Sequence, residues 1–311
     1  MIIKLNPAFQ SYLWGGNRLK THFGKQFSGE IIAESWELSC HPDGLSTVAI
    51  GEYAGITLPE WIEKNGREVL GENCRRVKAF PILVKIIDAK QALSIQVHPN
   101  DEYALKNEGQ CGKTEMWYVL HNEPGAFLYH GFARDITKQE YENAVENGCI
   151  TDYLRKIEVK KGDVFFIEAG TVHAIGAGIV IAEIQQSSNL TYRVFDYGRL
   201  DANGQARPLH KAKAVEVSKL TAEKEAPDFG GHIGACEYFI TDKVKVSGEY
   251  KGFADKTSFR HMLVAEGEGS AKCGEQDISF SIGDSLFIAA GSGEYKIIGE
   301  CEVLITYIPK R

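Results

Sequence analysis

The sequence predicts a mainly β protein built from two sandwich or barrel units, with small helical insertions. Three observations support this prediction. Short apolar runs typical of strands recur along all 311 residues, 32 glycines supply turns between them, and one nine-residue pattern occurs twice. The chain is longer than a typical single domain, and a hydrophobic content of 43% is enough for two packed cores.

The clearest predicted strands are apolar runs bounded by turn residues. They cover residues 80–87, 115–120, 163–167, 179–184 and 303–307. Two other stretches place apolar side chains at every third or fourth position. This spacing predicts helical insertions at about residues 57–78 and 134–156.

The repeated pattern lies at residues 162–170 and 283–291, and it favours two copies of one β unit. The first copy is followed by His173, whereas Glu294 stands at the same place after the second. We therefore expect no metal in the second copy. A charged stretch at residues 221–227 is the predicted linker, which divides the chain into a catalytic domain at 1–225 and a metal-free β domain at 226–311.

Charge and cysteine content exclude several classes of protein. The net charge is −7 and no basic run occurs, which argues against a nucleic-acid or membrane partner. No apolar run is long enough to span a bilayer. Seven cysteines without a regular spacing do not make a disulfide framework, and the N-terminus lacks the apolar core of a signal peptide. These features predict a cytoplasmic protein.

Gln96 and His98 are the first candidate metal ligands, because residues two apart in a strand share one face. Glu115 and His173 are the two further residues that would complete the site. Two imidazoles, one carboxylate and one amide oxygen suit a zinc ion and leave room for a substrate oxygen.

Six further motifs lie at residues 12–16, 35–37, 92–99, 113–117, 170–173 and 187–199. In content and order they resemble the signatures of one enzyme family, the type I mannose-6-phosphate isomerases in their short bacterial form. Residues 162–173 also resemble the second conserved motif of cupin barrels. The resemblance covers about Leu5 to His210 and implies a double cupin-like fold of jelly-roll barrels.

The resemblance implies a zinc-dependent interconversion of mannose 6-phosphate and fructose 6-phosphate, with one zinc ion per chain. It places the metal at Gln96, His98, Glu115 and His173, and an essential arginine at Arg193. Moving a carbonyl between two sugar carbons removes a proton from carbon and leaves negative charge on an enediolate oxygen. A divalent ion stabilises that charge, and an arginine suits either the enediolate or the substrate phosphate.

The residues that move the proton and bind the phosphate are predicted from strand position alone. Glu183 and Lys113 are the candidate bases, and we favour Glu183. Ser94 shares the strand face of the metal ligands, and Lys85 lies on the preceding strand. A hydroxyl and an ammonium would recognise a phosphate dianion.

Two other classes compete with the isomerase. An iron dioxygenase of the cupin kind also uses two histidines and one carboxylate, although Gln96 argues against it. A non-catalytic sugar-binding barrel is the third class. For the isomerase we expect a small sugar phosphate as the partner, and a monomer or weak homo-oligomer.

Overall fold

The computed structural model describes residues 1–200, 204–223 and 227–310. The chain forms two compact units. The first unit contains Met1–Gln10, Asn17–Ile86 and Asp228–Arg311, and the second contains Ser11–Gly16 and Ile87–Pro227. Both units are mainly β, as predicted. Within the described residues, no helix combines the length and apolar character needed to cross a bilayer.

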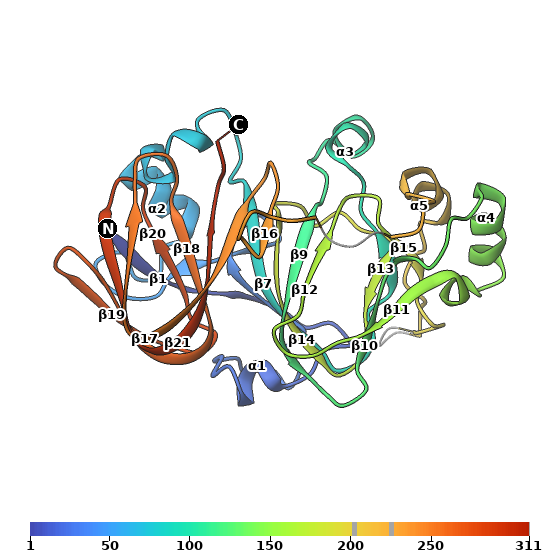
Figure 1. Cartoon of the computed structure of the whole chain (residues 1–311), viewed down its shortest axis with the longest axis horizontal. Coiled ribbons are helices and arrows are strands. Elements are labelled where there is room, and N and C mark those ends of the chain that lie inside the picture. Colours follow the sequence, from blue (N-terminus) through green and yellow to red (C-terminus); the bar gives the residue numbers. More distant parts are fainter. Residues whose placement is uncertain (201–203, 224–226, 311) are drawn as a thin grey trace. The chain divides into compact units, whose positions relative to one another are not determined.

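The first unit is built on an eight-stranded sheet. Its order is β16-β17-β21-β18-β20-β1-β6, with β19 paired to β18. The strands are β1 (Ile2–Asn6), β6 (Thr47–Val48), β16 (Gly234–Ala235), β17 (Ile240–Ala254), β18 (Arg260–Cys273), β19 (Gln276–Ser281), β20 (Ser285–Ile288) and β21 (Gly293–Tyr307). Figure 1 shows the long strands β17, β21 and β18 side by side. Side chains from the strands of this sheet, such as Val264 of β18, Leu286 of β20 and Val303 of β21, form the buried core.

The first unit does not follow the predicted division into residues 1–225 and 226–311. Strand β1 pairs with β20, from Ile2 opposite Ile288 to Leu5 opposite Ser285. The N-terminal strand therefore belongs to the same sheet as the C-terminal strands. A local sequence pattern does not reveal pairing between the two ends of a chain. For this reason the predicted division separated β1 from the C-terminal strands. Lys224, Glu225 and Ala226 of the predicted linker lie outside the described residues.

Smaller elements complete the first unit. They are β2 (Ala8–Gln10), α1 (Arg18–Thr21), β3 (Glu34–Leu38), β4 (Cys40–His41), β5 (Gly44–Leu45), α2 (Leu58–Asn65) and two 3-10 turns, η1 (Arg67–Leu70) and η2 (Glu72–Cys74). Helix α2 and these turns occupy the predicted insertion at 57–78. Thr57 and Glu60 start α2 with a reciprocal capping box. Strand β7 (Ile82–Ala89) then carries the chain from the first unit into the second.

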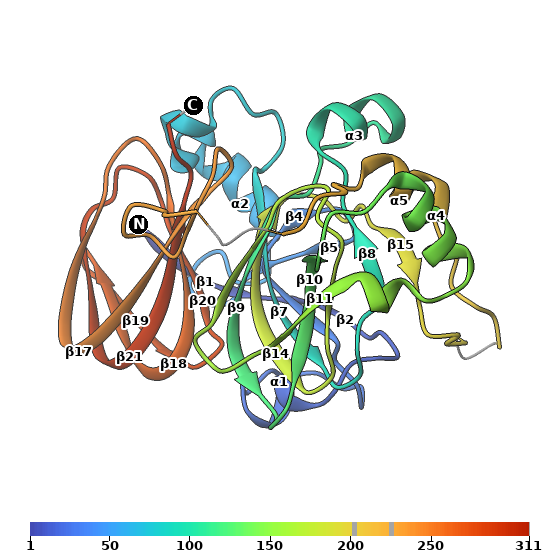
Figure 2. The same cartoon turned by 45° about the vertical axis from the view of Figure 1, so that its right-hand side comes forward.

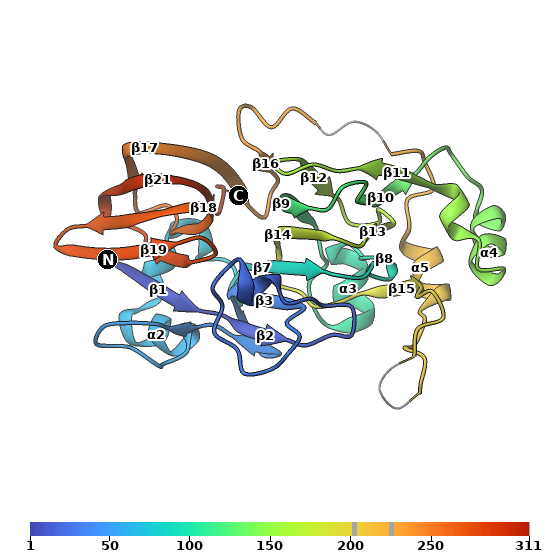
Figure 3. The same ribbon diagram turned by 90° about the horizontal axis from the view of Figure 1, so that it is seen from below.

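The second unit contains a five-stranded sheet with the order β11-β10-β13-β8-β15, and a further strand β9 that pairs with both β12 and β14. The strands are β8 (Ile95–Val97), β9 (Glu115–Asn122), β10 (Phe127–Phe132), β11 (Leu154–Glu158), β12 (Val164–Ile167), β13 (His173–Ile175), β14 (Ile179–Gln186) and β15 (Tyr192–Phe195). Figure 3 shows β10, β13, β8 and β15 following one another across the sheet.

Three helices belong to the second unit: α3 (Asp101–Glu108), α4 (Lys138–Glu146) and α5 (Lys211–Val217). Figure 2 shows α4 and α5 lying next to each other, and Tyr141 and Val215 belong to one buried apolar cluster. The predicted helix at 134–156 is too long. A left-handed Gly148 follows α4, a 3-10 turn η3 (Ile150–Tyr153) comes next, and residues 154–158 pair with β10 as strand β11.

The two copies of the repeated pattern fold alike. Each forms a four-residue strand, β12 in the first copy and β20 in the second. The turn before each strand is closed by the aspartate of the pattern. Asp163 accepts the backbone N–H of Lys160 at 2.9 Å, and Asp284 accepts that of Ser281 at 2.8 Å. This shared turn supports a duplicated β unit.

In the first unit, strand register places Arg260 at the position that corresponds to Glu115. Ile167 of β12 lies opposite Glu115, whereas the equivalent Ile288 of β20 lies opposite Arg260. A guanidinium has no lone pair to offer a metal. The absence of a metal from this unit stays a prediction, and the exchange of Glu for Arg is its chemical basis.

Candidate metal centre

One row of side chains crosses the five-stranded sheet of the second unit. His130 lies opposite His173, His173 lies opposite Gln96, and Gln96 lies opposite Arg193. Residues directly opposite each other in antiparallel strands extend their side chains to the same face. The register of β10, β13, β8 and β15 therefore brings together residues that are far apart in the sequence.

Strands β9 and β14 supply the carboxylates of the site. Glu115 and Trp117 are two residues apart in β9 and share a face, and Glu183 of β14 lies opposite Trp117. The Trp117 indole Nε1–H donates to Glu183 Oε1 at 3.2 Å. Strand alternation thus places both carboxylates on one face.

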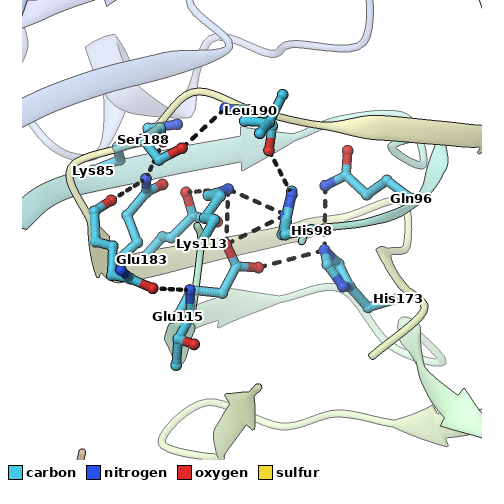
Figure 4. Close-up of polar contacts among 12 residues, drawn as sticks. Lys85, Gln96, His98, Lys113, Glu115, His173, Glu183, Ser188 and Leu190 are labelled. Carbon is cyan, nitrogen blue, oxygen red and sulfur yellow. Dashed lines mark hydrogen bonds and ion pairs between the residues drawn. The ribbon is translucent and has the colours of Figure 1, made fainter. Parts of the chain in front are cut away.

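His98, Glu115 and His173 form a compact buried cluster, which Figure 4 shows in detail. His98 Nε2 lies 3.6 Å from Glu115 Oε2, and His173 Nε2 lies 3.4 Å from Glu115 Oε1. The ligand atoms of the three residues all lie within 4.8 Å of one another. The Gln96 amide is 3.4 Å from His173 Nε2, so rotation of this amide brings its oxygen to the cluster.

Backbone carbonyls orient both imidazoles. His98 Nδ1 is 2.8 Å from the carbonyl of Leu190, and His173 Nδ1 is 2.9 Å from that of Thr171. Since a carbonyl only accepts, each Nδ1 carries the proton and each Nε2 keeps its lone pair toward Glu115. Burial lowers the pKa of His173 to about 3, which keeps this ring neutral. This arrangement of donors fits a divalent metal ion.

The charge balance of the site also fits a cation. Lys113 Nζ lies 2.7 Å from Glu115 Oε2, 3.7 Å from Glu183 Oε2 and 3.3 Å from His98 Nε2. All three charged side chains are buried. Two carboxylates and one ammonium leave one negative charge, which a divalent ion would more than offset.

The predicted phosphate ligands are not part of this cluster. Ser94 is buried two residues before Gln96. Lys85 belongs to the first unit, where its Nζ lies 3.2 Å from Glu34 Oε2 and 4.8 Å from the centre of the Trp36 ring. Its ammonium is therefore engaged by a buried carboxylate.

Arg193 is half-buried, and its Nη1 donates to the carbonyl of Pro208 at 3.0 Å. Burial and the neighbouring Arg207 lower the pKa of Arg193, although a guanidinium still stays charged. From the sequence alone, Arg193 could instead be a structural residue in a salt bridge with Asp196 or Glu183. The structure instead pairs Asp196 with Arg199 and Arg207, the latter through two bonds of 2.7 Å. Arg207 lies outside the motifs named above, so no motif predicted its contact with Asp196.

A mainly β fold with a buried His–Glu–His cluster that could hold a metal ion is typical of the cupin class of proteins. Two protein-family models match the chain. The model described as "Phosphomannose isomerase type I, catalytic domain" matches residues 2–129, and the model described as "Mannose-6-phosphate isomerase, cupin domain" matches residues 232–308. The chain belongs to the type I phosphomannose isomerase family, whose members are isomerases. This membership confirms the family resemblance and the cupin fold class expected from the sequence.

Relatives and solved structures are similar over nearly the whole chain. The mannose-6-phosphate isomerase ManA of Bacillus subtilis is 37% identical, with 97% of each chain covered. The mannose-6-phosphate isomerase of Streptococcus mutans is 35% identical, again with 97% of each chain covered. A crystal structure of the mannose 6-phosphate isomerase from Bacillus subtilis matches with a TM-score of 0.90 at 36% identity, covering 99% of each chain.

Proposed function

We propose that this protein interconverts mannose 6-phosphate and fructose 6-phosphate as a zinc-dependent aldose-ketose isomerase. The observation that carries the proposal is the buried cluster of His98, Glu115 and His173, within a chain 37% identical over 97% of its length to a mannose-6-phosphate isomerase. Membership of the family supports the reaction, and the donor set supports the metal.

We assign one zinc ion per chain to Gln96, His98, Glu115 and His173. Imidazole nitrogens and carboxylate oxygens are the usual zinc ligands besides thiolates. Because Gln96 is neutral, the site has only one ligating carboxylate and would leave net positive charge on the ion. A zinc ion bound there would act as a Lewis acid toward negative charge on the substrate oxygen.

We assign proton transfer between the two sugar carbons to Glu183. The hydrogen bond from Trp117 Nε1 at 3.2 Å holds this carboxylate in place. Lys113, the alternative base, lies 2.7 Å from Glu115 and is engaged as a donor between two carboxylates. We therefore give Lys113 the task of positioning Glu115 and Glu183.

We assign stabilisation of the enediolate to Arg193. Its strand register opposite Gln96 puts the guanidinium on the face that carries the metal ligands. A guanidinium keeps its charge and supplies directed donors to developing negative charge. Ser94 and Lys85 stay predictions as phosphate ligands, and Lys85 would have to exchange its contact with Glu34 to act in this way.

The test is a coupled assay of the purified protein with mannose 6-phosphate, before and after chelation and again after zinc is restored. We expect activity that disappears with the metal and returns with zinc. Oxygen consumption with bound iron would instead indicate a dioxygenase. Sugar phosphate binding without solvent exchange of the C2 proton would indicate a non-catalytic barrel. The cytoplasmic location and a monomeric or weakly oligomeric state stay predictions.

A further inference from the structure

The connection between β14 and β15, residues 187–191, touches one of the candidate metal ligands. The carbonyl of Leu190 accepts the Nδ1–H of His98 at 2.8 Å. A backbone carbonyl cannot turn independently of its chain, so the direction of the His98 ring depends on what holds this connection in place. Figure 4 shows the contacts that run from Ser188 through Leu190 to His98.

Ser188 holds the connection through a single hydroxyl group. Its side chain is fully buried. The hydroxyl donates to the carbonyl of Cys111 at 3.0 Å, and its oxygen accepts the N–H of Leu190 at 3.3 Å. The backbone N–H of Ser188 closes a tight turn by donating to the carbonyl of Gln186 at 2.7 Å. A hydroxyl that donates in one direction and accepts from another has a defined orientation, and it fixes Leu190 accordingly.

Gln185 holds the same turn from the end of β14. Its Nε2 donates to the carbonyl of Gln186 at 2.8 Å and to the carbonyl of Ser188 at 2.6 Å. Both partners only accept, so the nitrogen and the oxygen of this amide cannot exchange places. Gln185 also lies directly opposite Glu115 in the pairing of β14 with β9. The residue that holds the turn therefore shares a sheet face with a candidate metal ligand.

The amide oxygen of Gln185 makes this side chain unfavourable for stability. Gln185 is fully buried, and within the part of the chain that the structure describes its Oε1 accepts no hydrogen bond. A buried acceptor without a donor costs free energy that an apolar side chain of similar shape would avoid. Local rules of this kind are broken most often at functional sites. The unpaired oxygen therefore favours a functional role for the donor end of the amide.

Gln186, the last residue of β14, holds the segment that leads to Glu115. Its Oε1 accepts the N–H of Thr114 at 2.9 Å, and its Nε2 donates to Asp101 Oδ1 at 2.9 Å. The same oxygen of Asp101 accepts the N–H of Gly112 at 2.8 Å. The end of β14 and the connection that follows it thus support two candidate ligands from different strands.

We propose that Gln185 and Ser188 are positioning residues for the candidate metal centre. They fix the Leu190 carbonyl, which fixes the tautomer and the direction of the His98 ring, and in this way they set the affinity for the metal. Hydrogen-bond partners of this outer layer typically change metal affinity by about 10- to 100-fold. The inference rests on the metal assigned under the proposed function, and it does not depend on the reaction.

The binding test titrates the metal-free protein with zinc in competition with a chromophoric chelator. We expect the dissociation constant for zinc to rise about 10- to 100-fold in Ser188→Ala and in Gln185→Met. Two matched controls should keep the original constant. Ser218→Ala removes a hydroxyl that donates to the carbonyl of Ala214 at 2.7 Å at the end of α5, and Gln139→Met changes an exposed residue of α4. Unchanged zinc affinity in both test variants would contradict the inference.

Thermal unfolding of the metal-free proteins separates positioning from general support of the fold. Gln185→Met removes two hydrogen bonds together with the unpaired oxygen, so we expect its Tm to stay close to that of the unchanged protein. A lower Tm with unchanged zinc affinity would show that Gln185 only supports the fold. If Ser188→Ala does not fold, Gln185→Met remains the test variant.

A double variant tests whether both residues act through the same carbonyl. If they do, the rise in the zinc dissociation constant for Gln185→Met with Ser188→Ala is smaller than the product of the two single effects. A rise equal to the full product would show independent actions and would contradict the shared route through Leu190.

The tautomer of His98 gives a spectroscopic signature that loss of stability alone would not produce. Nitrogen-15 NMR of the metal-free protein distinguishes a ring protonated at Nδ1 from one protonated at Nε2. We expect His98 to carry its proton on Nδ1 in the unchanged protein, and both tautomers to be populated in Ser188→Ala and Gln185→Met. The same single tautomer in all three proteins would overturn the inference.

Zinc binding and turnover together separate this inference from the proposed function. If zinc binds and weakens in the variants but the protein does not isomerise mannose 6-phosphate, the proposed reaction fails and this inference stands. If the protein isomerises the sugar and both variants bind zinc as tightly as the unchanged protein, the inference fails and the proposed function stands. An unchanged protein that takes up no zinc would overturn both.

Discussion

Arg193 lies directly opposite Gln96 in the antiparallel pairing of β15 with β8. Since opposite residues share a face, a permanent cation stands next to a candidate metal ligand. We have assigned these two groups separate tasks, metal binding to Gln96 and charge stabilisation to Arg193.

Replacing either histidine of the cluster should remove the metal. We expect purified His98→Ala and His173→Ala to contain little zinc by elemental analysis and to lose at least about 100-fold in turnover, because each removes a ligand nitrogen. His22→Ala, which changes an exposed histidine, should keep both zinc and activity. A ligand variant with full zinc content and near-normal turnover would contradict the assignment.

Replacing Arg193 should leave the metal in place. We expect Arg193→Ala to retain zinc while kcat falls about 100- to 1,000-fold, since a lost donor to developing negative charge raises the transition-state energy. Zinc content and steady-state kinetics on the same preparation give both measurements. Arg155→Ala is the matched control. Loss of zinc from Arg193→Ala would show that the residue supports the ligands, and full activity would rule out its catalytic role.

Glu183→Gln should stop proton transfer at carbon. The amide keeps the size of the side chain but cannot accept the proton, so we expect kcat to fall about 100- to 10,000-fold. In deuterated water, incorporation of solvent deuterium at C2 should fall equally. Glu158→Gln, an exposed position of β11, is the control. If Glu183→Gln still exchanges the C2 proton and Lys113→Met does not, Lys113 is the base.

His261 should make the first unit sensitive to acid. It is fully buried, its Nε2 lies 2.9 Å from Ser285 Oγ, and burial lowers its pKa to about 3. The unfolded chain has the ordinary histidine pKa of about 6.5 and binds this proton first as pH falls. Stability is therefore complete above about pH 6.5 and declines toward pH 3 by up to about 1.4 kcal/mol per pH unit.

The measurement is urea unfolding at several pH values between 4 and 7. We expect His261→Gln to reduce the pH dependence of the unfolding free energy by about one proton, because glutamine does not titrate. His22→Gln should keep the original dependence, since His22 is exposed. An unchanged slope in His261→Gln would mean that this ring binds its proton equally in the folded and unfolded states.

Much of the candidate site could be predicted from the sequence. Gln96 and His98 share one short motif, and the motifs around Glu115, His173 and Arg193 pointed to the same family. Strand alternation and motif spacing are local properties, so they are readable without coordinates. The prediction of a helix through residue 156 was wrong, because residues 154–158 pair with β10 and form a strand.

The sequence by itself determined the fold class, the family and the chemistry of the candidate ligands, because each depends on residue types at short spacing. The tertiary structure decided which distant groups meet. Pairing of β1 with β20, the contact of Lys85 with Glu34, and the sharing of Asp196 by Arg199 and Arg207 all follow from strand register and loop closure. Such contacts depend on the three-dimensional path of the chain, and no local pattern of residues encodes them.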